Sequence, residues 1–361
     1  MVRTLHIIGS RGLGGAERFF ARLTTALADT GNPVLAVTRP GVQLQDELGE
    51  KVEHRTIPMR TFWDLISAWQ IRRVIADWRP DIVQTYMGRA TRLTHLRERS
   101  GPLQLARLGG YYPVRQYRHA DAWITNTRGI AEYLIGEGLP AGRVFQIPNF
   151  VNTPTAASEA ERERLRLALG VPQQARVILG IGRLHASKGF TDLIKAFSML
   201  PAIIGRRPVF LIIVGAGPLE RTLQRKAEAL GLEGRVRWTG WQTEPAPYYR
   251  LADLMVCPSR HEPYGNVILE AWSHETAVLA TETAGGRELI APAENGWLVP
   301  CENPEPLASA ITTLLEDDVL RAQLTRGGRQ TLQARFSKHT IVRAYLDLYE
   351  RLLEEKRRRE A

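Results

Sequence analysis

The sequence predicts an α/β fold with two domains, each built around a parallel sheet. Three observations support this class. The chain has 361 residues, whereas a single hydrophobic core stops growing near ~250–300 residues. Short apolar runs alternate with segments of helical period, as in βαβ units. This alternation occurs in both halves of the chain, so we expect two similar doubly wound domains that face a central cleft.

The first domain is expected over residues 1–152. A glycine-rich turn from Gly9 to Gly15 follows its first strand, and Phe19, Leu23 and Leu27 then repeat with a helical period. The strands expected in this half are Thr4–Ile8, Val34–Val37, His54–Ile57, Ile82–Gln84, Leu103–Arg107, Trp123–Thr125 and Val144–Ile147.

A linker is expected over residues 153–174, because the stretch Glu159–Arg166 is rich in charge and poor in apolar side chains. The second domain is expected over residues 175–338. Residues 339–361 predict an amphipathic helix that packs back on the first domain, with apolar side chains spaced by three or four. The strands expected in the second domain are Val177–Ile181, Val209–Val214, Val236–Thr239, Leu254–Cys257, Ala277–Ala280 and Gly296–Leu298.

The charge of the chain indicates an anionic partner. The net charge is +10, from 48 Lys and Arg against 38 Asp and Glu, and 42 of the 48 cations are Arg. Residues 1–152 contribute +7 of this, from 20 basic and 13 acidic side chains. Charge alone does not choose between nucleic acid, a lipid surface and a phosphorylated small molecule.

Other compositional features narrow the setting. Two cysteines, Cys257 and Cys301, form neither a disulfide framework nor a spaced metal-ligand cluster. The longest apolar runs are about six residues, far below the ~20 needed to cross a bilayer. We therefore expect a cytoplasmic protein, one that at most sits peripherally on the inner face of the cell membrane.

The turn from Gly9 to Gly15 suits a phosphate, because backbone N–H groups approach an anion freely where Cβ atoms are absent. Its pattern is not G-x-G-x-x-G, since the position that would carry the third glycine holds Glu17. A nicotinamide enzyme is therefore disfavoured. The alternative for Gly14 and Gly15 is a tight turn that merely needs small residues.

Two further segments carry charged side chains after predicted strands. Arg183 and Lys188 lie five residues apart in a strand-to-helix turn. The planar guanidinium of Arg183 and the compact ammonium of Lys188 together suit a diphosphate. In the alternative, the two residues simply lie in an exposed turn. Glu262 and Glu270 flank a Pro-Tyr-Gly turn and suit sugar hydroxyls. In the alternative, Glu262 caps a helix and Glu270 is a solvated helix residue.

In combination these segments resemble the family-4 retaining glycosyltransferases of the GT-B fold. The resemblance spans nearly the whole chain and implies two Rossmann-like domains facing a cleft. It rests on Gly14-Gly15-Ala-Glu-Arg18, Ile147-Pro-Asn149, Gly182-Arg183, Lys188-Gly189, Glu262 to Glu270, Ala284-Gly-Gly-Arg-Glu288 and Gly296-Trp-Leu-Val-Pro300.

The resemblance implies a role for each matching residue. Arg183 and Lys188 are expected to bind the diphosphate of a nucleotide-sugar donor, and Glu262 to hold the donor sugar; these three form the expected catalytic set. Further donor contacts are expected at Gly14, Gly15, Pro263, Tyr264, Gly265, Asn266, Val267 and Glu270, the last on the ribose hydroxyls. No cofactor and no metal is expected, because the sequence contains no Asp-x-Asp triplet.

The first domain is expected to bind the acceptor. Many relatives carry a His after the fifth strand, where this chain has Arg107 to Tyr112 and no His. The expected acceptor contacts are Arg89, Arg107, Gly109, Gly110 and Tyr111. The surrounding sequence resembles the subset of the family that builds bacterial surface polysaccharides and lipopolysaccharide, which implies a glycolipid or oligosaccharide acceptor.

The expected function is thus retaining hexosyl transfer from a nucleoside-diphosphate sugar to a lipid-linked or polysaccharide acceptor. Two alternatives stay open: a GT-B epimerase or phosphorylase and, in another class, an Arg-rich adaptor that binds polyanions or membranes. No nucleic-acid partner is expected, because no recognition motif for nucleic acid is present. The segment Phe62–Trp69, followed by Arg72 and Arg73, predicts either a contact with an anionic membrane surface or a core helix.

Overall fold

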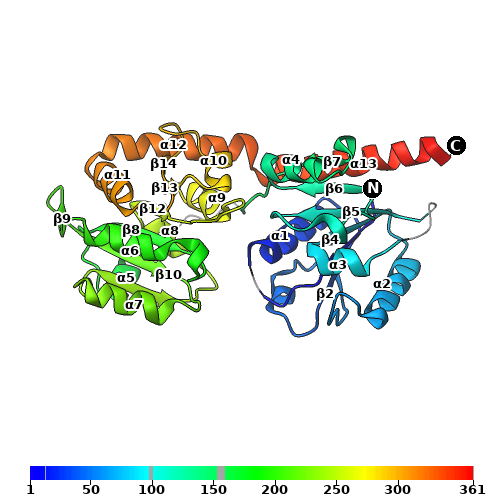
Figure 1. Ribbon diagram of the computed structural model, residues 1–361, viewed down its shortest axis with the longest axis horizontal. Coiled ribbons are helices and arrows are strands. Elements are labelled where there is room, and N and C mark those ends of the chain that lie inside the picture. Colours follow the sequence, from blue (N-terminus) through cyan, green and yellow to red (C-terminus); the bar gives the residue numbers. More distant parts are fainter. Residues whose placement is uncertain (13, 97–100, 153–158, 361) are drawn as a thin grey trace. The chain divides into compact units, whose positions relative to one another are not determined.

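The computed structural model describes residues 1–12, 14–96, 101–152 and 159–360, which form two compact units. The first unit comprises Met1–Phe150 and Phe336–Ala361, and the second comprises Val151–Arg335. The chain therefore changes unit at residues 150 and 335, whereas the sequence analysis expected 152 and 338. Both units are α/β structures (Figure 1).

The expected linker, 153–174, is only partly described, because its residues 153–158 lie outside the described part of the chain. The remainder belongs to the second unit. Helix α5 (Glu159–Ala168) packs against α8 (Ala246–Leu251), and Arg166 on α5 donates to the backbone carbonyls of Pro172 and Ala175 at 2.8 and 3.3 Å. The charged stretch that predicted a linker is thus a helix, and Arg166 holds it to the segment before β8.

The first unit contains a parallel sheet in the order β3-β2-β1-β4-β5-β6-β7. All seven strands were predicted, and the boundaries differ by one or two residues. The order reverses between β1 and β4, which pair directly. In doubly wound sheets, ligands bind in the crevice outside the carboxyl ends of the strands at such a reversal. The strands are β1 (Thr4–Ile8), β2 (Val34–Thr38), β3 (Glu53–Thr56), β4 (Ile82–Tyr86), β5 (Leu103–Leu108), β6 (Ala122–Thr125) and β7 (Val144–Gln146).

Helices cover both faces of this sheet. The C-terminal helix α13, red in Figure 1, packs on the first unit through Ile341, Tyr345, Leu348 and Leu352, which share a buried cluster with Phe19 and Phe20 of α1. Tyr345 and Leu352 are 0% and 2% exposed. The helices of this unit are α1 (Gly15–Asp29), α2 (Leu65–Trp78), α3 (Met87–Leu93), α4 (Arg128–Gly136) and α13 (Lys338–Glu360), with short 3-10 turns η1 (Gln43–Glu47), η2 (Val114–Gln116) and η3 (Ala141–Arg143).

Helix α2 has a buried face and an exposed face, and the core-helix alternative describes the buried face. Ile71, Val74, Ile75 and Trp78 are buried in a core cluster against the sheet. The preceding turn and the first helical turn carry large apolar side chains that face solvent instead: Trp63 (72% exposed), Leu65 (78%), Ile66 (69%) and Trp69 (55%).

The second unit contains a sheet in the order β11-β10-β8-β12-β13-β14, with parallel pairing throughout this order. Its six strands were predicted; the short β9, which pairs antiparallel with β10, was not. The order reverses between β8 and β12. The strands are β8 (Arg176–Ile181), β9 (Ile203–Ile204), β10 (Arg207–Val214), β11 (Val236–Gly240), β12 (Leu254–Cys257), β13 (Ala277–Thr281) and β14 (Trp297–Val299).

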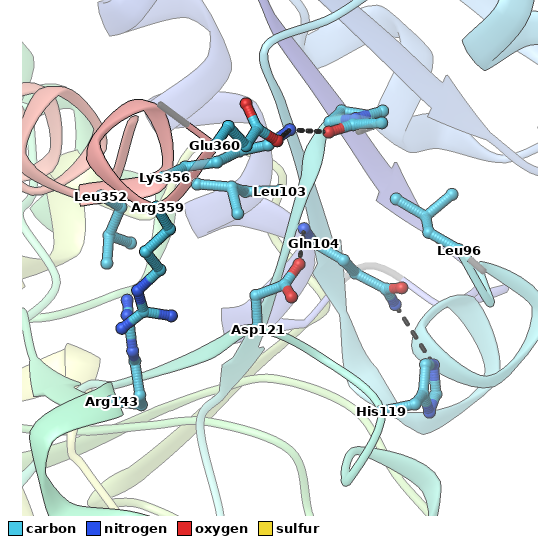
Figure 2. A pocket seen from close by; sticks show the side chains of 12 residues that line it. Leu96, Leu103, Gln104, His119, Asp121, Arg143, Leu352, Lys356, Arg359 and Glu360 are labelled. Atoms are coloured by element: carbon cyan, nitrogen blue, oxygen red, sulfur yellow. Dashed lines mark hydrogen bonds and ion pairs between the residues drawn. The ribbon is translucent and has the colours of Figure 1, made fainter. Parts of the chain in front are cut away.

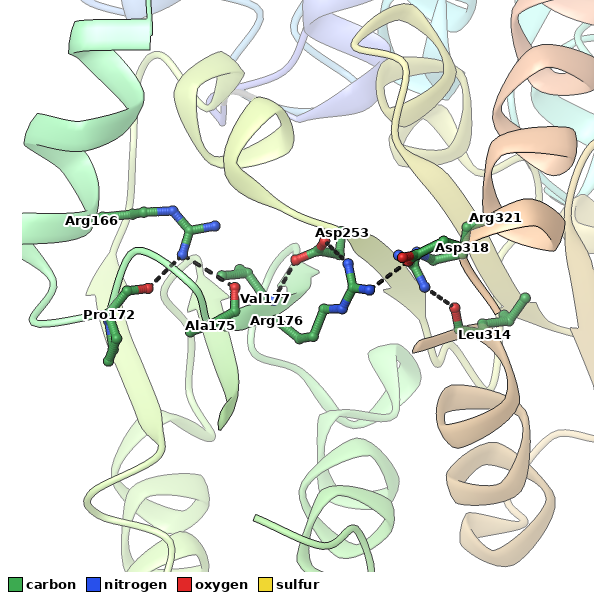
Figure 3. Close-up of polar contacts among 9 residues, drawn as sticks. All are labelled: Arg166, Pro172, Ala175, Arg176, Val177, Asp253, Leu314, Asp318 and Arg321. Carbon is green, nitrogen blue, oxygen red and sulfur yellow. Dashed lines mark hydrogen bonds and ion pairs between the residues drawn. The ribbon is translucent and has the colours of Figure 1, made fainter. Parts of the chain in front are cut away.

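Several arginines of this unit stabilise its amino-terminal edge (Figure 3). Arg176, at the start of β8, donates to Asp253 at 3.0 Å and also to Asp318, which Arg321 contacts in turn. Arg176 and Arg321 are each 8% exposed. The helices of the unit besides α5 and α8 are α6 (Phe190–Ser198), α7 (Glu220–Ala229), α9 (Asn266–Ser273), α10 (Ala284–Leu289), α11 (Pro304–Glu316) and α12 (Asp318–Arg335), with the 3-10 turn η4 (Ala186–Lys188).

Among the described residues, no helix has the length and apolar character required to cross a membrane.

Candidate active site

The charged residues predicted to bind the donor lie together at the carboxyl ends of β8 and β12. Lys188 ends the turn that follows β8, and Glu262 lies in the loop that follows β12. The strand order reverses between these two strands, which pair directly, and doubly wound sheets bind ligands in the crevice outside the carboxyl ends of strands at such a reversal.

Lys188 and Glu262 form an ion pair between Nζ and Oε2. Their side chains are 30% and 12% exposed, so water screens the pair only partly. Burial alone would disfavour the ammonium, but the Glu262 carboxylate outweighs it and raises the pKa of Lys188. The structure therefore brings the expected phosphate-binding and sugar-binding residues into direct contact, with Lys188 fully charged at neutral pH.

Backbone contacts fix the two loops against each other. The N–H groups of Arg260 and His261 donate to the carbonyl of Ser187 at 2.9 and 3.0 Å. Gly189 has φ +65°, and a Cβ at this position would lie 1.8 Å from the carbonyl oxygen of Pro258. Only glycine combines the left-handed backbone with this close approach. Gly189 is therefore needed to bring the loops after β8 and β12 together.

The loop around Glu262 is held from its other side by α10. Gly285 N–H donates to the Glu262 carbonyl at 2.8 Å, and a Cβ on Gly285 would lie 2.2 Å from the Tyr264 carbonyl oxygen. Gly265, with φ +98°, is the residue that caps α9, so Glu262 is not the helix cap of the alternative prediction. Pro263 and Tyr264 thus form the turn, and Asn266 and Val267 form the first turn of α9.

Glu270 lies in the second turn of α9 and is partly buried. Its Oε2 accepts a hydrogen bond of 2.9 Å from the Tyr249 hydroxyl. Tyr249 is itself buried and stacks on His274 at 5.4 Å between ring centroids. Glu270 is therefore held in a defined orientation and is not the freely solvated residue of the alternative prediction.

Arg183 lies two residues after β8 and is exposed. Within the described part of the chain, its guanidinium has no hydrogen-bond or ion-pair partner. The backbone beside it is fixed, because the N–H of Gly182 donates to the Val214 carbonyl at 3.0 Å. Arg183 thus offers an unpaired cation at the same edge as Lys188.

Sequence reasoning missed two residues that position this site. Arg260 donates through Nε and Nη2 to both oxygens of Asp192, at 2.8 Å each, and so ties the loop of Glu262 to α6. Tyr249 orients Glu270. The sequence offers a signal only for Arg260, which lies two residues before Glu262; Tyr249 lies on a different helix.

In the first unit, Gly14 caps α1 and Gly15 begins it. Both are exposed, and the Glu17 carboxylate accepts from Gly14 N–H at 2.9 Å. The two glycines thus lie at the carboxyl end of β1, and the Gly14 N–H is bonded to a carboxylate of its own helix. The carboxyl end of β5 carries Gly109, Gly110 and Tyr111, and Tyr111 is 40% exposed.

Arg107 differs from its expected role as an acceptor contact. It is 3% exposed, its Nε donates to the Tyr345 hydroxyl at 2.9 Å, and its Nη2 donates to Asn149 Oδ1. Its guanidinium also lies 4.0 Å from the ring centroid of Phe19. These contacts place Arg107 in the core beneath α13, which argues against direct contact with an acceptor.

A cavity of about 470 Å³ lies elsewhere in the first unit (Figure 2). It is lined by Leu103 at the start of β5, by Asp121 before β6, and by Arg143, Lys356 and Arg359. Ligands of doubly wound sheets bind at the carboxyl ends of strands, whereas this cavity is at the amino ends. We therefore assign it neither donor nor acceptor. In the described ranges, no three His, Cys, Asp or Glu side chains gather as metal ligands.

Comparisons with known families match both units. A family model described as glycosyl transferases group 1 matches residues 161–331, and one described as glycosyltransferase family 4 matches residues 13–154. The chain is 33% identical over 339 residues to the lipopolysaccharide core biosynthesis glycosyltransferase LpsE of Rhizobium meliloti, covering 93% of this chain and 95% of LpsE. It is 31% identical over 341 residues to LpsD of the same organism, covering 94% and 95%.

Solved structures share the fold over nearly the whole chain. Anabaena HepE in complex with UDP and glucose has a TM-score of 0.85 at 21% identity, covering 97% of this chain and 100% of HepE. WaaG, a glycosyltransferase involved in lipopolysaccharide biosynthesis, has a TM-score of 0.73 at 18% identity, covering 96% and 99%. These likenesses confirm the GT-B architecture expected from the sequence.

Proposed function

Because this chain belongs to the family-4 glycosyltransferases, we propose that it transfers a hexose from a nucleoside-diphosphate sugar to a lipid-linked oligosaccharide, with retention of configuration. Membership of a transferase family favours an enzyme over the polyanion-binding adaptor. The relatives LpsE and LpsD are named for lipopolysaccharide core biosynthesis, and the chain covers 95% of each. They support a core oligosaccharide of lipopolysaccharide as the acceptor.

The crevice between the β8 and β12 loops carries the donor assignment. Its cations, Arg183 and Lys188, suit a diphosphate, because the guanidinium and the ammonium together offset two negative charges. The neighbouring Glu262 is 12% exposed, and its carboxylate can accept a hydrogen bond from a hydroxyl of the sugar. HepE is described in complex with UDP and glucose, which supports a nucleotide-sugar donor here.

For the reaction we propose the front-face course that family membership implies. The bond between sugar C1 and the diphosphate oxygen breaks, and the acceptor oxygen forms its bond to C1 on the same face. The leaving phosphate oxygen takes the proton of the acceptor hydroxyl. Arg183 and Lys188 stabilise the negative charge that develops on the diphosphate. We propose that these cations do this without a bound metal, so transfer should persist in excess EDTA.

A transfer assay tests the proposal. The purified chain is incubated with each common nucleoside-diphosphate hexose and with lipopolysaccharide truncated in its core, and the acceptor is analysed by mass spectrometry. We expect one donor to add a single hexose mass, and Glu262→Ala to abolish this product while the protein stays folded. Conversion of the donor to an isomer without an acceptor-sized product would instead support the epimerase, and release of a sugar 1-phosphate from a glycan with inorganic phosphate would support the phosphorylase.

We propose in addition that the exposed face of α2 contacts an anionic membrane surface, where a lipid-linked acceptor resides. We call Trp63, Leu65, Ile66 and Trp69 the α2 patch. Arg92 and Arg73 lie 3.6 and 5.7 Å from the ring centroids of Trp63 and Trp69. Apolar side chains that insert between headgroups, flanked by cations that pair with anionic lipid, are the features of an interfacial helix.

Vesicle flotation tests this contact. We expect binding to vesicles of phosphatidylethanolamine and phosphatidylglycerol, weaker binding to phosphatidylcholine alone, and loss of binding in the double variant Trp63→Ala/Trp69→Ala. Leu167→Ala, at an 83% exposed leucine of α5, is the matched control. Equal flotation of the double variant would refute the assignment, and a change in its oligomeric state would indicate a protein partner instead.

A further inference from the structure

The crevice between β1 and β4 in the first unit contains arginines that the proposed donor site does not use. Arg39 directly follows β2, Arg89 lies on α3 after β4, and Arg11 follows β1. These positions share the carboxyl edge of neighbouring strands at the reversal of strand order. The first unit thus repeats the location at which the second unit collects its cations.

Arg39 is a largely covered residue whose guanidinium has no partner in the described chain. It is 5% exposed, yet its guanidinium has no hydrogen-bond or ion-pair partner among the residues that the structure describes. The acid that acts on it is Asp64, whose oxygens already accept from Arg60 N–H at 2.9 Å, from Ser67 N–H at 3.1 Å and from Ser67 Oγ at 2.8 Å. Arg39 therefore presents a guanidinium that no acceptor of the described chain engages, next to a single acid whose oxygens are already occupied.

Arg89 is held rigidly beside the same crevice. Its Nη1 donates to the carbonyls of Gly9 and Met59 at 3.1 and 3.2 Å, whereas its Nε is buried without a partner. Its side chain lies on Gly9, where a Cβ would be 3.3 Å from Arg89 Cδ. Gly9 therefore provides the space in which Arg89 lies, and Arg89 retains a donor that lacks an acceptor.

Cations outnumber acids around Arg39, where Arg11 and Arg89 act against Asp64 alone. Burial, and then the neighbouring cations Arg11 and Arg89, lower the pKa of the Arg39 guanidinium. By contrast, the buried Arg107 and Arg176 have oxygen partners that fix them as structural. Cations that repel one another in a shielded crevice are stabilised when an anion binds between them.

We propose that Arg39 and Arg89 form a binding site for an oxyanion, a phosphate or a carboxylate carried by the acceptor. The planar guanidinium groups of the two arginines match the geometry of phosphate and carboxylate oxygens. Phe62, whose ring centroid lies 5.5 Å from the Arg89 guanidinium, adds an apolar wall that suits a sugar face. That the anion belongs to the acceptor rests on the proposed function; the anion site itself rests on the two arginines.

Calorimetry on the whole chain tests the site with the donor turn saturated by a nucleoside diphosphate, so that added phosphate does not bind there. The probes are glucose 6-phosphate, glucuronate and neutral glucose. We expect at least one anionic probe to bind tenfold or more tightly than glucose. Arg39→Gln and Arg89→Gln should each reduce that affinity tenfold or more, whereas Arg343→Gln, at an exposed arginine of α13, should not. Equal affinities in all variants, or no preference for an anion, would overturn the proposal.

Thermal melting separates this role from a structural one. Without an added anion, Arg39→Gln should melt at or above the temperature of the unmodified chain, because it removes repulsion and breaks no hydrogen bond; a markedly lower melting temperature would assign Arg39 to the fold and refute the site. If anion binding depends on Arg39 and Arg89 while no sugar transfer occurs with any acceptor, the proposed function fails and the anion site stands.

Discussion

The ion pair between Lys188 and Glu262 makes a prediction that separates donor binding from folding. Lys188→Ala removes a charge-assisted contact to the diphosphate, which typically contributes about 1.5–3 kcal/mol. The dissociation constant of the best-bound nucleoside diphosphate should therefore rise about 10- to 150-fold. Arg183→Ala should weaken binding by a similar factor, since it removes the second cation.

The two variants should differ in stability. Lys188→Ala leaves the Glu262 carboxylate, 12% exposed, without its partner, which costs roughly 1–3 kcal/mol. For a domain of this size the melting temperature should fall by roughly 2–12 °C. Arg183 is exposed, and its side chain makes no hydrogen bond or ion pair within the described part of the chain, so Arg183→Ala should melt as the unmodified protein does.

Calorimetry and thermal melting on four variants and the unmodified chain test both predictions. The double variant Lys188→Ala/Glu262→Gln should recover much of the lost stability, because no unpaired carboxylate remains, but it should not recover nucleotide affinity. Lys195→Ala, at a 49% exposed lysine of α6, controls for net charge and should change neither. Unchanged nucleotide affinity in both Lys188→Ala and Arg183→Ala would refute the diphosphate assignment.

Three further predictions concern the fold. Arg107→Leu should lower stability by about 2–5 kcal/mol, because it leaves the Tyr345 hydroxyl and Asn149 unpaired; a normal melting temperature with a raised acceptor KM would restore its expected acceptor role. Gly189→Ala should destabilise the second unit far more than Gly205→Ala, whose φ is also positive but whose Cβ would meet no atom within 4 Å; equal chemical denaturation midpoints would count against the close approach. Burial lowers the pKa of His6 to about 3 in the folded protein, whereas an unfolded His has a pKa of ~6.5. Between these two values the unfolded state binds a proton at His6 and the folded state does not. As the pH is lowered from 6 to 4, His6 should reduce the free energy of unfolding by about 1.4 kcal/mol per pH unit. The free energy of unfolding of His6→Gln should depend less steeply on pH; the same dependence in both proteins would contradict the burial of His6.

The sequence predicts the strands closely because strands of a parallel sheet are buried on both faces and appear as short apolar runs between glycines. Only β9, two residues long, falls below what periodicity detects. The faces of α2 are harder to predict, because Trp and Leu serve equally well in a core and on an exposed surface. Whether Trp69 is buried depends on the sheet beneath the helix rather than on its neighbours in sequence.

At the site, the sequence predicts which residues surround the donor but not how they pair. Lys188 and Glu262 are 74 positions apart, and no local pattern shows that they meet. Arg107 was expected to contact the acceptor because it lies where many relatives carry a His. Its partner Tyr345 is 238 positions away on α13, so no local pattern shows that Arg107 belongs to the core. Arg39 escaped notice because it is one of 42 arginines, and only the structure shows that it lacks the oxygen partners of Arg107 and Arg176.

A crystal structure of the chain with its best-bound nucleoside diphosphate is the most direct measurement of the central claim, that the crevice between β8 and β12 holds the donor. We predict density for the diphosphate within hydrogen-bond distance of Arg183 and Lys188, with Glu262 facing the position of the transferred sugar. Density for the diphosphate at any other edge of the second unit, with both cations uninvolved, would contradict the account.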